Sequence, residues 1–284
     1  MRPVSEETEL RLQHGGPPGS RDLIALGPDG AVAGYARLES DGQAFAELVV
    51  HPAARGQGIG RALLTRLELL AGERPLGFWA HGDLPGATAL AERRGYARAR
   101  VLLQLRRDLA GVDPDPRPAL PDGVVVRPFR PGKDEAAWLR VNARAFARHP
   151  EQGSWTEEDL RLREAEPWFD PAGFLLAWHG DPDAGGELLG SHWTKVHPPG
   201  DVGDTAPDES IGEIYELGID PSAKGMRLGP ALTDLGLAYL RRRGLARVML
   251  YVEEDNAGAV RLYESRGFRR HAVDVAWRRD PAAG

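Results

Sequence analysis

Short apolar runs alternate with amphipathic segments along the chain and predict a series of strands and helices. In the second half, the strands are predicted at residues 123–129, 173–178, 187–198, 211–220, 247–255 and 271–279. Apolar positions three and four apart predict helices at 133–149, 229–244 and 256–267. Strands that alternate with helices in this way are typical of an α/β fold.

The first half repeats the later part of this pattern. Its predicted strands are 23–28, 31–39, 44–52, 76–82 and 99–107, and its predicted helices are 60–73 and 86–95. A Gly-rich phrase follows the third strand at about residue 55, whereas its counterpart comes about 100 residues into the second half. The spacing therefore predicts that the first half lacks an opening strand and helix.

A proline-rich segment, GVDPDPRPALPDG, separates the two halves. Proline interrupts both helices and central strands, so this segment is typical of a linker. We therefore predict a first domain at residues 1–110, a linker at 111–122 and a second domain at 123–284.

Composition narrows the class of protein. A content of 42% hydrophobic and 27% charged residues is that of a soluble globular protein, and no apolar run reaches the roughly 18 residues of a membrane span. The first residues lack the apolar core of a signal peptide, and there are no cysteines for disulfides or thiolate metal sites. The net charge of −6 argues against a nucleic-acid surface. We expect a cytoplasmic monomer without nucleic-acid or membrane partners.

Two similar phrases each join a strand to a helix: HPAARGQGIGRAL at residues 51–63 and DPSAKGMRLGPAL at residues 220–232. Free N–H groups at a helix N-terminus bind anions, and glycine lets the backbone approach a pyrophosphate. No Gly-Lys-Ser/Thr follows, as in a P-loop, and no dinucleotide fingerprint is present. A tight turn without a ligand is the alternative, which the duplication makes less attractive.

These phrases resemble the pyrophosphate loop of the GNAT acetyltransferases, and NAGAVRLYESRGF at residues 256–268 resembles the final motif of that family. The resemblance implies two tandem domains, each a mixed, splayed β-sheet flanked by helices, with acetyl-CoA as co-substrate. In the second half it assigns acetyl-CoA contacts to Leu217, Gly218, Ile219, Lys224, Gly225, Met226, Arg227, Leu228, Gly229, Pro230, Asn256, Ala257, Gly258, Ala259, Val260 and Arg261. In the first half it assigns them to Leu48, Val49, Val50, Gly56, Gln57, Gly58, Ile59, Gly60 and Arg61.

Further phrases, among them AFARHPEQGSWT, SHWTKVHP and GEIYELGID, resemble a tandem-domain branch of this family, the actinobacterial mycothiol acetyltransferases. The match runs from about Pro3 to the C-terminus. It implies acetylation of the cysteinyl amine of a cysteine–glucosamine–inositol conjugate, which gives mycothiol. Two alternatives stay open: an acetyltransferase for another small amine such as an aminoglycoside, and a non-catalytic CoA-binding sensor.

Comparison of the two halves selects candidate catalytic residues. When His51-Pro52 is set against Asp220-Pro221, Glu213 lies opposite Ala44, and a second match places Tyr263 opposite Ala91. Glu213 is therefore the candidate general base and Tyr263 the candidate acid for the leaving thiolate. The backbone at Leu217 to Ile219 is where this fold supplies oxyanion donors. In the alternative interpretation, Glu213 is an exposed strand residue and Tyr263 is a core residue.

Other expectations follow from the resemblance. It assigns substrate contacts to Glu6, Glu151, Lys195, Tyr251 and Glu213. Lys195 is one of three lysines among 36 basic residues, although a solvated strand lysine is the alternative. His192 and His197 flank Lys195 without an evident carboxylate partner, so we predict no metal site.

Arg227 departs from the family pattern, because it stands where most members have glycine. We expect it to offer a backbone N–H at a negative φ while its side chain adds a phosphate contact. Alternatively, the side chain obstructs the pyrophosphate.

Overall fold

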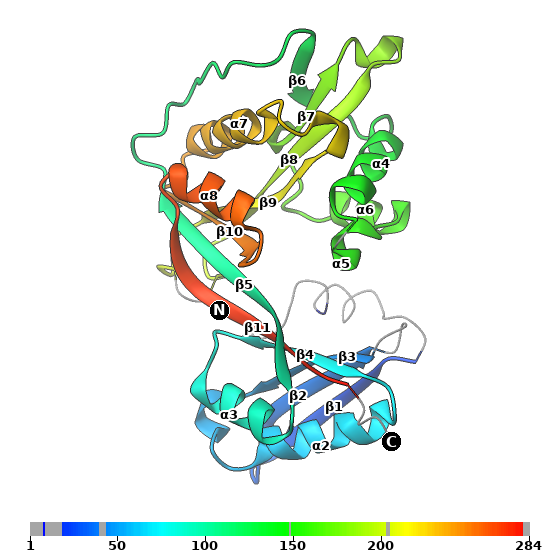
Figure 1. The fold of residues 1–284 in the computed structure, drawn as a ribbon. Helices are drawn as coiled ribbons and strands as arrows, with labels where there is room; N and C mark the ends of the chain where they lie inside the picture. Colours follow the sequence, from blue (N-terminus) through cyan, green and yellow to red (C-terminus); the bar gives the residue numbers. More distant parts are fainter. Residues whose placement is uncertain (1–7, 9–18, 40–43, 148, 203–204, 281–284) are drawn as a thin grey trace. The chain divides into compact units, whose positions relative to one another are not determined.

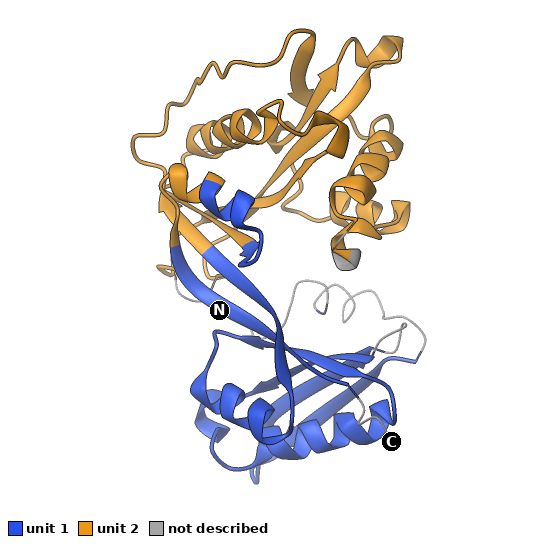
Figure 2. Ribbon diagram, in the orientation of Figure 1, with its two compact units in different colours: residues 1–104, 252–261, 270–284 blue, residues 105–251, 262–269 orange. Residues whose placement is uncertain are grey.

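The chain forms two compact units that do not follow its linear order (Figure 2). The computed structural model describes residues 8, 19–39, 44–147, 149–202 and 205–280. Unit 1 combines Met1–Gln104, Val252–Arg261 and Arg270–Gly284, and unit 2 combines Leu105–Tyr251 and Leu262–Arg269. Unit 1 therefore combines the predicted first domain up to residue 104 with residues 252–261 and most of the last strand of the chain.

Unit 1 is a sheet with two helices. Its elements are β1 (Arg21–Leu26), β2 (Val32–Glu39), β3 (Ala44–Val50), α2 (Ile59–Ala71), β4 (Leu76–His81), α3 (Pro85–Arg93), the first part of β5 (Ala97–Asp108), and β11 (Arg269–Arg279). The strand order is β1-β2-β3-β4-β11, with β3 and β4 parallel and the other pairs antiparallel. Leu63, Leu64 and Leu67 of α2 pack against the sheet and form its core together with Trp277 of β11.

Unit 2 is a second sheet, with helices on both faces (Figure 1). Its elements are β6 (Val124–Pro128), α4 (Glu135–Ala145), α5 (Pro150–Gly153), α6 (Glu157–Glu164), β7 (Phe174–His179), β8 (Glu187–His197), β9 (Ile211–Ile219), α7 (Leu228–Arg242), β10 (Arg247–Glu253) and the end of α8 (Ala257–Ser265). The strand order is β10-β9-β8-β7-β6. Trp138 of α4 packs with Trp193 on one face, whereas Leu228 and Leu232 of α7 pack with Leu189 on the other.

The predicted α/β fold class, with mixed β-sheet structure flanked by helices, is confirmed. Each strand and helix predicted from periodicity is present, with ends that differ by a few residues, while α5 and α6 were not predicted. Residues 109–123 form neither helix nor strand. The predicted loss of an opening strand and helix concerns residues 1–18, of which the structure describes only Thr8.

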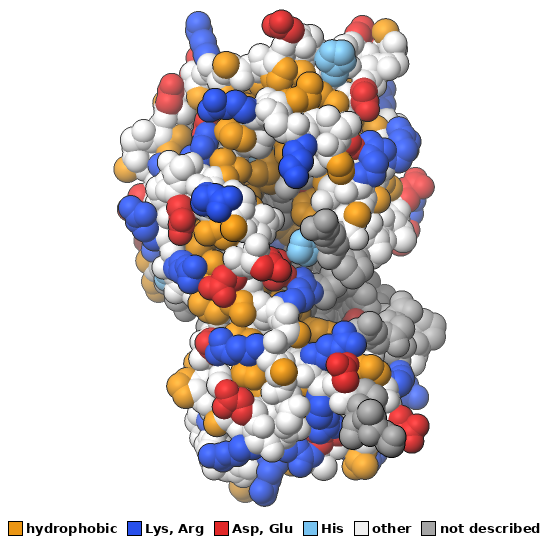
Figure 3. Space-filling view, viewed as in Figure 1, with side chains coloured by type: hydrophobic (Ala, Val, Ile, Leu, Met, Phe, Trp, Pro, Cys, Tyr) orange, Lys and Arg blue, Asp and Glu red, His pale blue; other side chains and the backbone are white. Residues whose placement is uncertain are grey.

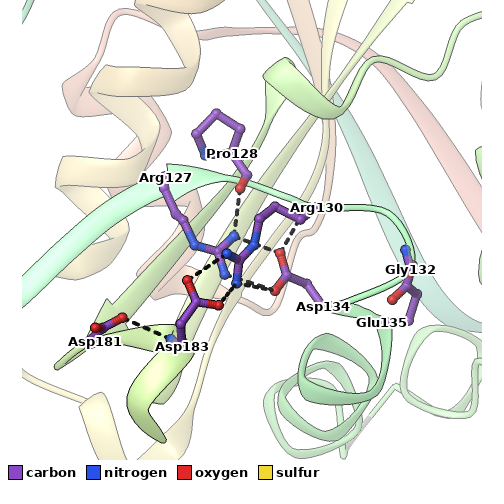
Figure 4. Close-up of polar contacts among 8 residues, drawn as sticks. All are labelled: Arg127, Pro128, Arg130, Gly132, Asp134, Glu135, Asp181 and Asp183. Carbon is purple, nitrogen blue, oxygen red and sulfur yellow. Dashed lines mark hydrogen bonds and ion pairs between the residues drawn. The ribbon is translucent and has the colours of Figure 1, made fainter.

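An ion-pair network holds the connection from β6 to α4 (Figure 4). Arg127 donates to both carboxylate oxygens of Asp134, at 2.7 and 2.8 Å, and Arg130 donates to both oxygens of Asp183, at 2.9 Å each. Burial disfavours the Asp134 carboxylate, but its hydrogen bonds to Arg127 and to the Arg130 backbone outweigh this effect and lower its pKa. Because Asp134 is the N-cap residue of α4, the network anchors the helix that carries Trp138 to the sheet.

Candidate active site

A β-bulge in β9 brings two glutamates to the same face of the unit 2 sheet. Lys195 of β8 pairs with Glu213 and Trp193 pairs with Glu216, so Tyr215 is the extra residue on β9. In a regular strand, residues three apart point to opposite faces. The bulge removes this alternation, and Glu213 and Glu216 both lie on the face covered by α4.

Glu213 ends a hydrogen-bonded chain of three side chains. Its Oε2 lies 2.6 Å from His197 Nε2, and His197 Nδ1 lies 2.6 Å from Asp201 Oδ2. Burial disfavours the imidazolium, but the hydrogen bonds to Asp201 and Glu213 outweigh this effect and raise the pKa of His197. The Glu213 side chain remains about 10% exposed, whereas that of His197 is 3% exposed. His197 therefore fixes the Glu213 side chain in place, while part of that side chain stays accessible to solvent.

Lys195 lies across the ladder from Glu213, among aromatic rings. Its Nζ is 4.3 Å from the Trp168 ring centroid and 5.4 Å from that of Tyr215. Arg163 Nε donates to Tyr215 Oη at 2.8 Å, which orients this ring. Lys195 is buried, so the interpretation of a solvated strand lysine is wrong. Cation–π contacts of this kind stabilise an ammonium group that has lost water.

Glu216 is fully buried and, in the described part of the chain, is hydrogen-bonded to Ser191. Ser191 Oγ donates to it at 2.9 Å and accepts from Trp138 Nε1 at 3.0 Å. Burial, which is only partly offset by these hydrogen bonds, raises the pKa of Glu216 to about 8. A Cβ on Gly218 would lie 2.4 Å from Glu216 Oε1, so the carboxyl group lies directly against the backbone of residue 218.

Backbone amides near the end of β9 face away from β8. The parallel ladder between β9 and β10 covers Gly212–Ile214, while β9 continues to Ile219. Asp220 N donates to Leu189 O of β8 at 2.9 Å. Because successive amides of a strand alternate in direction, the N–H groups of Leu217 and Ile219 point to the open side of β9.

The loop between β9 and α7 has the geometry of an anion site, with one difference from expectation. Gly225 has a φ of 90°, and Arg227, the N-cap residue of α7, has a φ of 59°. The expectation of a negative φ at Arg227 is wrong: this arginine adopts the left-handed conformation of its counterpart Gly58, whose φ is 84°. The Arg227 side chain is exposed, and Lys224, Gly225 and Met226 are exposed beside it. Leu228, Gly229 and Pro230 form the first turn of α7, where N–H groups have no partner within the helix.

Tyr263 lies on α8, buried against Phe268, with ring centroids 5.7 Å apart. Burial, followed by the nearby Glu216 carboxylate, raises the pKa of Tyr263 above its ordinary value. Leu262 of the same helix lies 3.7 Å from the Cβ position of Gly229, so α8 runs beside the first turn of α7. Asn256 Oδ1 accepts from Ala259 N at 3.2 Å, which makes Asn256 the capping residue of α8 ahead of Ala257, Gly258, Val260 and Arg261.

The first half keeps the backbone features but not the side chains of the two candidate catalytic residues. The β3–β4 ladder ends at Glu47, and His51 N donates to Ala33 O at 2.9 Å, so the amides of Leu48 and Val50 also face an open side. Ala44 and Ala91, the counterparts of Glu213 and Tyr263, belong to the unit 1 core. Val49 lies on the same strand, and Gly56, Gln57, Gly58, Ile59, Gly60 and Arg61 form the loop and first turn of α2.

Other predicted substrate residues are placed as follows. Tyr251 lies on β10 and is about 41% exposed. Glu151 lies on α5, and its side chain is outside the described part, as is the whole of Glu6. Comparison of the two halves of the sequence did not identify His197, Asp201 and Glu216 as parts of this site. The spacing of His197 and Asp201 around the end of β8 was the sequence feature that could have pointed to their contact. The described residues contain no group of three or more His, Asp or Glu side chains placed to bind a metal ion.

Figure 3 shows a hollow in the face of unit 2 with hydrophobic side chains along it, on the side where α7 and α4 flank β8 and β9 in Figure 1. None of the described helices combines the length and apolar character of a membrane span. Unit 2 therefore contains the Glu213 carboxylate held by His197, the open-side amides of β9, the first turn of α7 and the buried phenol of Tyr263. Acyl transfer from a thioester needs a base, oxyanion donors, an anion site and an acid, and these groups are of the types that can supply them.

Two family comparisons match the halves separately. Residues 139–268 match the acetyltransferase (GNAT) family, and residues 21–98 match an acetyltransferase (GNAT) domain. Among solved structures, a GCN5-related N-acetyltransferase from Sphaerobacter thermophilus is 28% identical with a TM-score of 0.70, over 99% of this chain and 87% of that one. A tandem GNAT protein from the clavulanic acid pathway has the same TM-score at 24% identity, over 98% and 88% of the two chains, and supports the fold.

Curated relatives narrow the assignment. A mycothiol acetyltransferase from Geodermatophilus obscurus is 70% identical over 98% of this chain and 89% of its own length. A mycothiol acetyltransferase from Thermomonospora curvata is 55% identical over 99% and 89% of the two lengths. The chain therefore belongs to the GNAT acetyltransferases and, within them, to the mycothiol acetyltransferase family.

Proposed function

We propose that this protein transfers the acetyl group of acetyl-CoA to the cysteinyl amine of a cysteine–glucosamine–inositol conjugate, which gives mycothiol. The high sequence identity to relatives named mycothiol acetyltransferase supports mycothiol as the product. The hydrogen-bonded chain Asp201–His197–Glu213, four residues before the free amide of Leu217, is the observation that carries the proposal for the site.

Glu213 acts as the general base. The attacking amine must be neutral, and an α-amino group with a pKa of about 7.7–8.0 is largely protonated at pH 7. Glu213 removes a proton directly or through one water, which contributes about 10²–10⁴ in rate. His197 holds Glu213 Oε2, so the second oxygen and the exposed edge of the side chain are presented to the amine.

The amides of Leu217 and Ile219 and the phenol of Tyr263 serve the thioester. The amine nitrogen bonds to the carbonyl carbon, and the oxyanion is stabilised by these amides, each worth about 3 kcal/mol. The carbon–sulfur bond then breaks, and the sulfur takes a proton from Tyr263. Tyr263 keeps its proton at neutral pH, as a phenol of ordinary pKa also would, and so has a proton to give when the thiolate forms.

The loop at residues 224–230 binds the pyrophosphate of acetyl-CoA. The N–H groups at the start of α7 point to an anion, and Lys224 and Arg227 supply exposed positive charge. Lys195, held against Trp168, contacts the acceptor near Glu213. The matching loop at residues 56–61 supports acetyl-CoA binding by unit 1 without catalysis.

The test incubates the purified chain with acetyl-CoA and a panel of amines that includes the cysteinyl-glucosaminyl-inositol and an aminoglycoside. Release of the CoA thiol is corrected for the acceptor's own thiol, and the product is identified by mass spectrometry. We expect N-acetylation of the cysteinyl amine at a kcat/KM at least tenfold above that for any other amine. Preference for the aminoglycoside would support an acetyltransferase for another small amine. If no amine is acetylated, the non-catalytic CoA-binding sensor is the interpretation that remains.

A further inference from the structure

Glu216 is a buried carboxyl group to which the mechanism above gives no role. It lies on β9 one residue before Leu217, and its Oε1 is 2.4 Å from the Cβ position of Gly218. The carboxyl group is therefore next to the segment whose amides face the thioester. In the described part of the chain no Lys, Arg or His forms an ion pair with it; its partner is the hydroxyl of Ser191.

The surroundings of Glu216 differ from those of the other carboxylate on this face. Glu213 is bound to His197, whereas Glu216 is enclosed by Ser191 from β8, Trp138 from α4 and Tyr263 from α8, and Phe146, directly after α4, lies against Gly218 beside it. Of these four neighbours only Tyr263 is titratable. The first half offers a comparison, because Glu47 holds the equivalent position and pairs across its ladder with Arg37, where Glu216 pairs with Trp193. The catalytic half thus has an aromatic ring where the other half has a cation.

We propose that Glu216 is a positioning residue that must remain a neutral carboxylic acid while acyl transfer takes place on the adjacent backbone. This inference rests on the proposed function. Negative charge develops on the carbonyl oxygen and then on the departing sulfur, and a carboxylate enclosed with them at low dielectric opposes both. An ionised Glu216 also makes Tyr263 a weaker acid toward the sulfur. No proton of Glu216 is transferred in the reaction, so the acid acts only through its lack of charge.

The inference predicts a specific alkaline limb in the pH profile. With both substrates saturating, we expect kcat of the wild-type protein to fall about tenfold per pH unit above about pH 8. Deprotonation of the acceptor amine raises the rate in this range, and Tyr263 titrates at higher pH. His197, whose pKa is also raised, is present in the wild type and in Glu216→Gln alike, so the difference between the two profiles reports Glu216. In Glu216→Gln the carboxamide cannot ionise, and the limb should be absent. Glu47→Gln in the first half is the matched control and should retain it.

A second readout needs no turnover. Infrared difference spectra between pH 7 and pH 9.5 should show the loss of a buried protonated carboxylic acid in the wild type and in Glu47→Gln, and no such loss in Glu216→Gln. An alkaline limb that persists unchanged in Glu216→Gln overturns the inference and leaves the proposed function intact. If the wild type acetylates no amine, the proposed function fails. If the infrared band of the protonated acid is absent at pH 7, Glu216 is not neutral, whatever the outcome of the activity assay.

Discussion

His197 Nε2 lies 2.6 Å from Glu213 Oε2, and the opposite nitrogen of the same ring is held by Asp201. This arrangement joins the end of β8 to the middle of β9 through side chains as well as through the ladder. It fixes the orientation of the carboxylate that we propose as the general base.

Replacement of Glu213 by glutamine tests the base directly. The carboxamide keeps the shape of the side chain but cannot accept a proton, so we expect kcat to fall about 100-fold or more. Binding of acetyl-CoA, measured by calorimetry, should be unchanged because the loop at residues 224–230 is untouched. A variant with full kcat at neutral pH would remove Glu213 from the mechanism.

His197 should make stability depend on pH. Its folded pKa is raised above the ordinary value of 6.5, so its stabilisation is fully present below about pH 6.5 and is lost as the pH rises through the folded pKa. The difference in unfolding free energy between the wild type and His197→Asn should shrink by up to about 1.4 kcal/mol per pH unit in that window. Urea unfolding followed by tryptophan fluorescence from pH 6 to 9 measures this difference. The exposed His179→Asn is the control, and a constant difference for His197→Asn would contradict the prediction.

Arg227→Gly should stabilise the protein. Arginine at a φ of 59° carries a strain of about 1 kcal/mol that glycine does not, so we expect a gain of about this size in unfolding free energy. Gly58→Ala is the reciprocal control: its Cβ meets no atom within 4 Å, so the same strain should appear as a loss of about 1 kcal/mol.

The same variant separates two roles of the Arg227 side chain. If the exposed guanidinium contacts a phosphate, Arg227→Gly should weaken acetyl-CoA binding by about threefold, the value of a solvated ion pair. A tenfold gain in affinity, measured by calorimetry, would instead mean that the side chain obstructs the pyrophosphate.

Gly236 of α7 and His192 of β8 should be strongly coupled. A Cβ at Gly236 would lie 2.0 Å from His192 Cε1, so Gly236→Ala should lower the unfolding free energy by about 2 kcal/mol. His192→Ala frees this space, and the double variant should recover at least about 1 kcal/mol of the cost in a double-mutant cycle. Additive effects of the two substitutions would show that α7 shifts to accommodate the methyl group.

Local periodicity was sufficient to predict the strands and the longer helices of this fold, because apolar spacing reports which face of each segment is buried. It did not predict the short helices α5 and α6. It could not predict that β11 pairs with β4 in unit 1, because the apolar pattern of a strand contains no record of its partner. The same limit applies to His197 and Asp201. Their contact with Glu213 depends on strand register, and the alternation rule would have placed Glu213 and Glu216 on opposite faces. Only the bulge at Tyr215 brings them together.

Comparison of the halves selected Glu213 and Tyr263 as catalytic candidates because a duplicated chain contains its own reference. The same comparison sets Arg227 opposite Gly58, which is a signal for a left-handed residue, but the expected φ was negative and was wrong. A left-handed arginine is rare, so residue statistics favour the other conformation, and the loop shape shared with Gly56 and Gly58 overrides that preference.

The placement of β11 has a consequence for synthesis on the ribosome. Trp277 belongs to the core of unit 1, although almost two hundred residues separate it from the end of α3. The part of the chain made first must therefore wait, with that core incomplete, until Trp277 has been translated. Unit 2 has every strand of its β6–β10 sheet from one continuous stretch of chain and can form that sheet earlier.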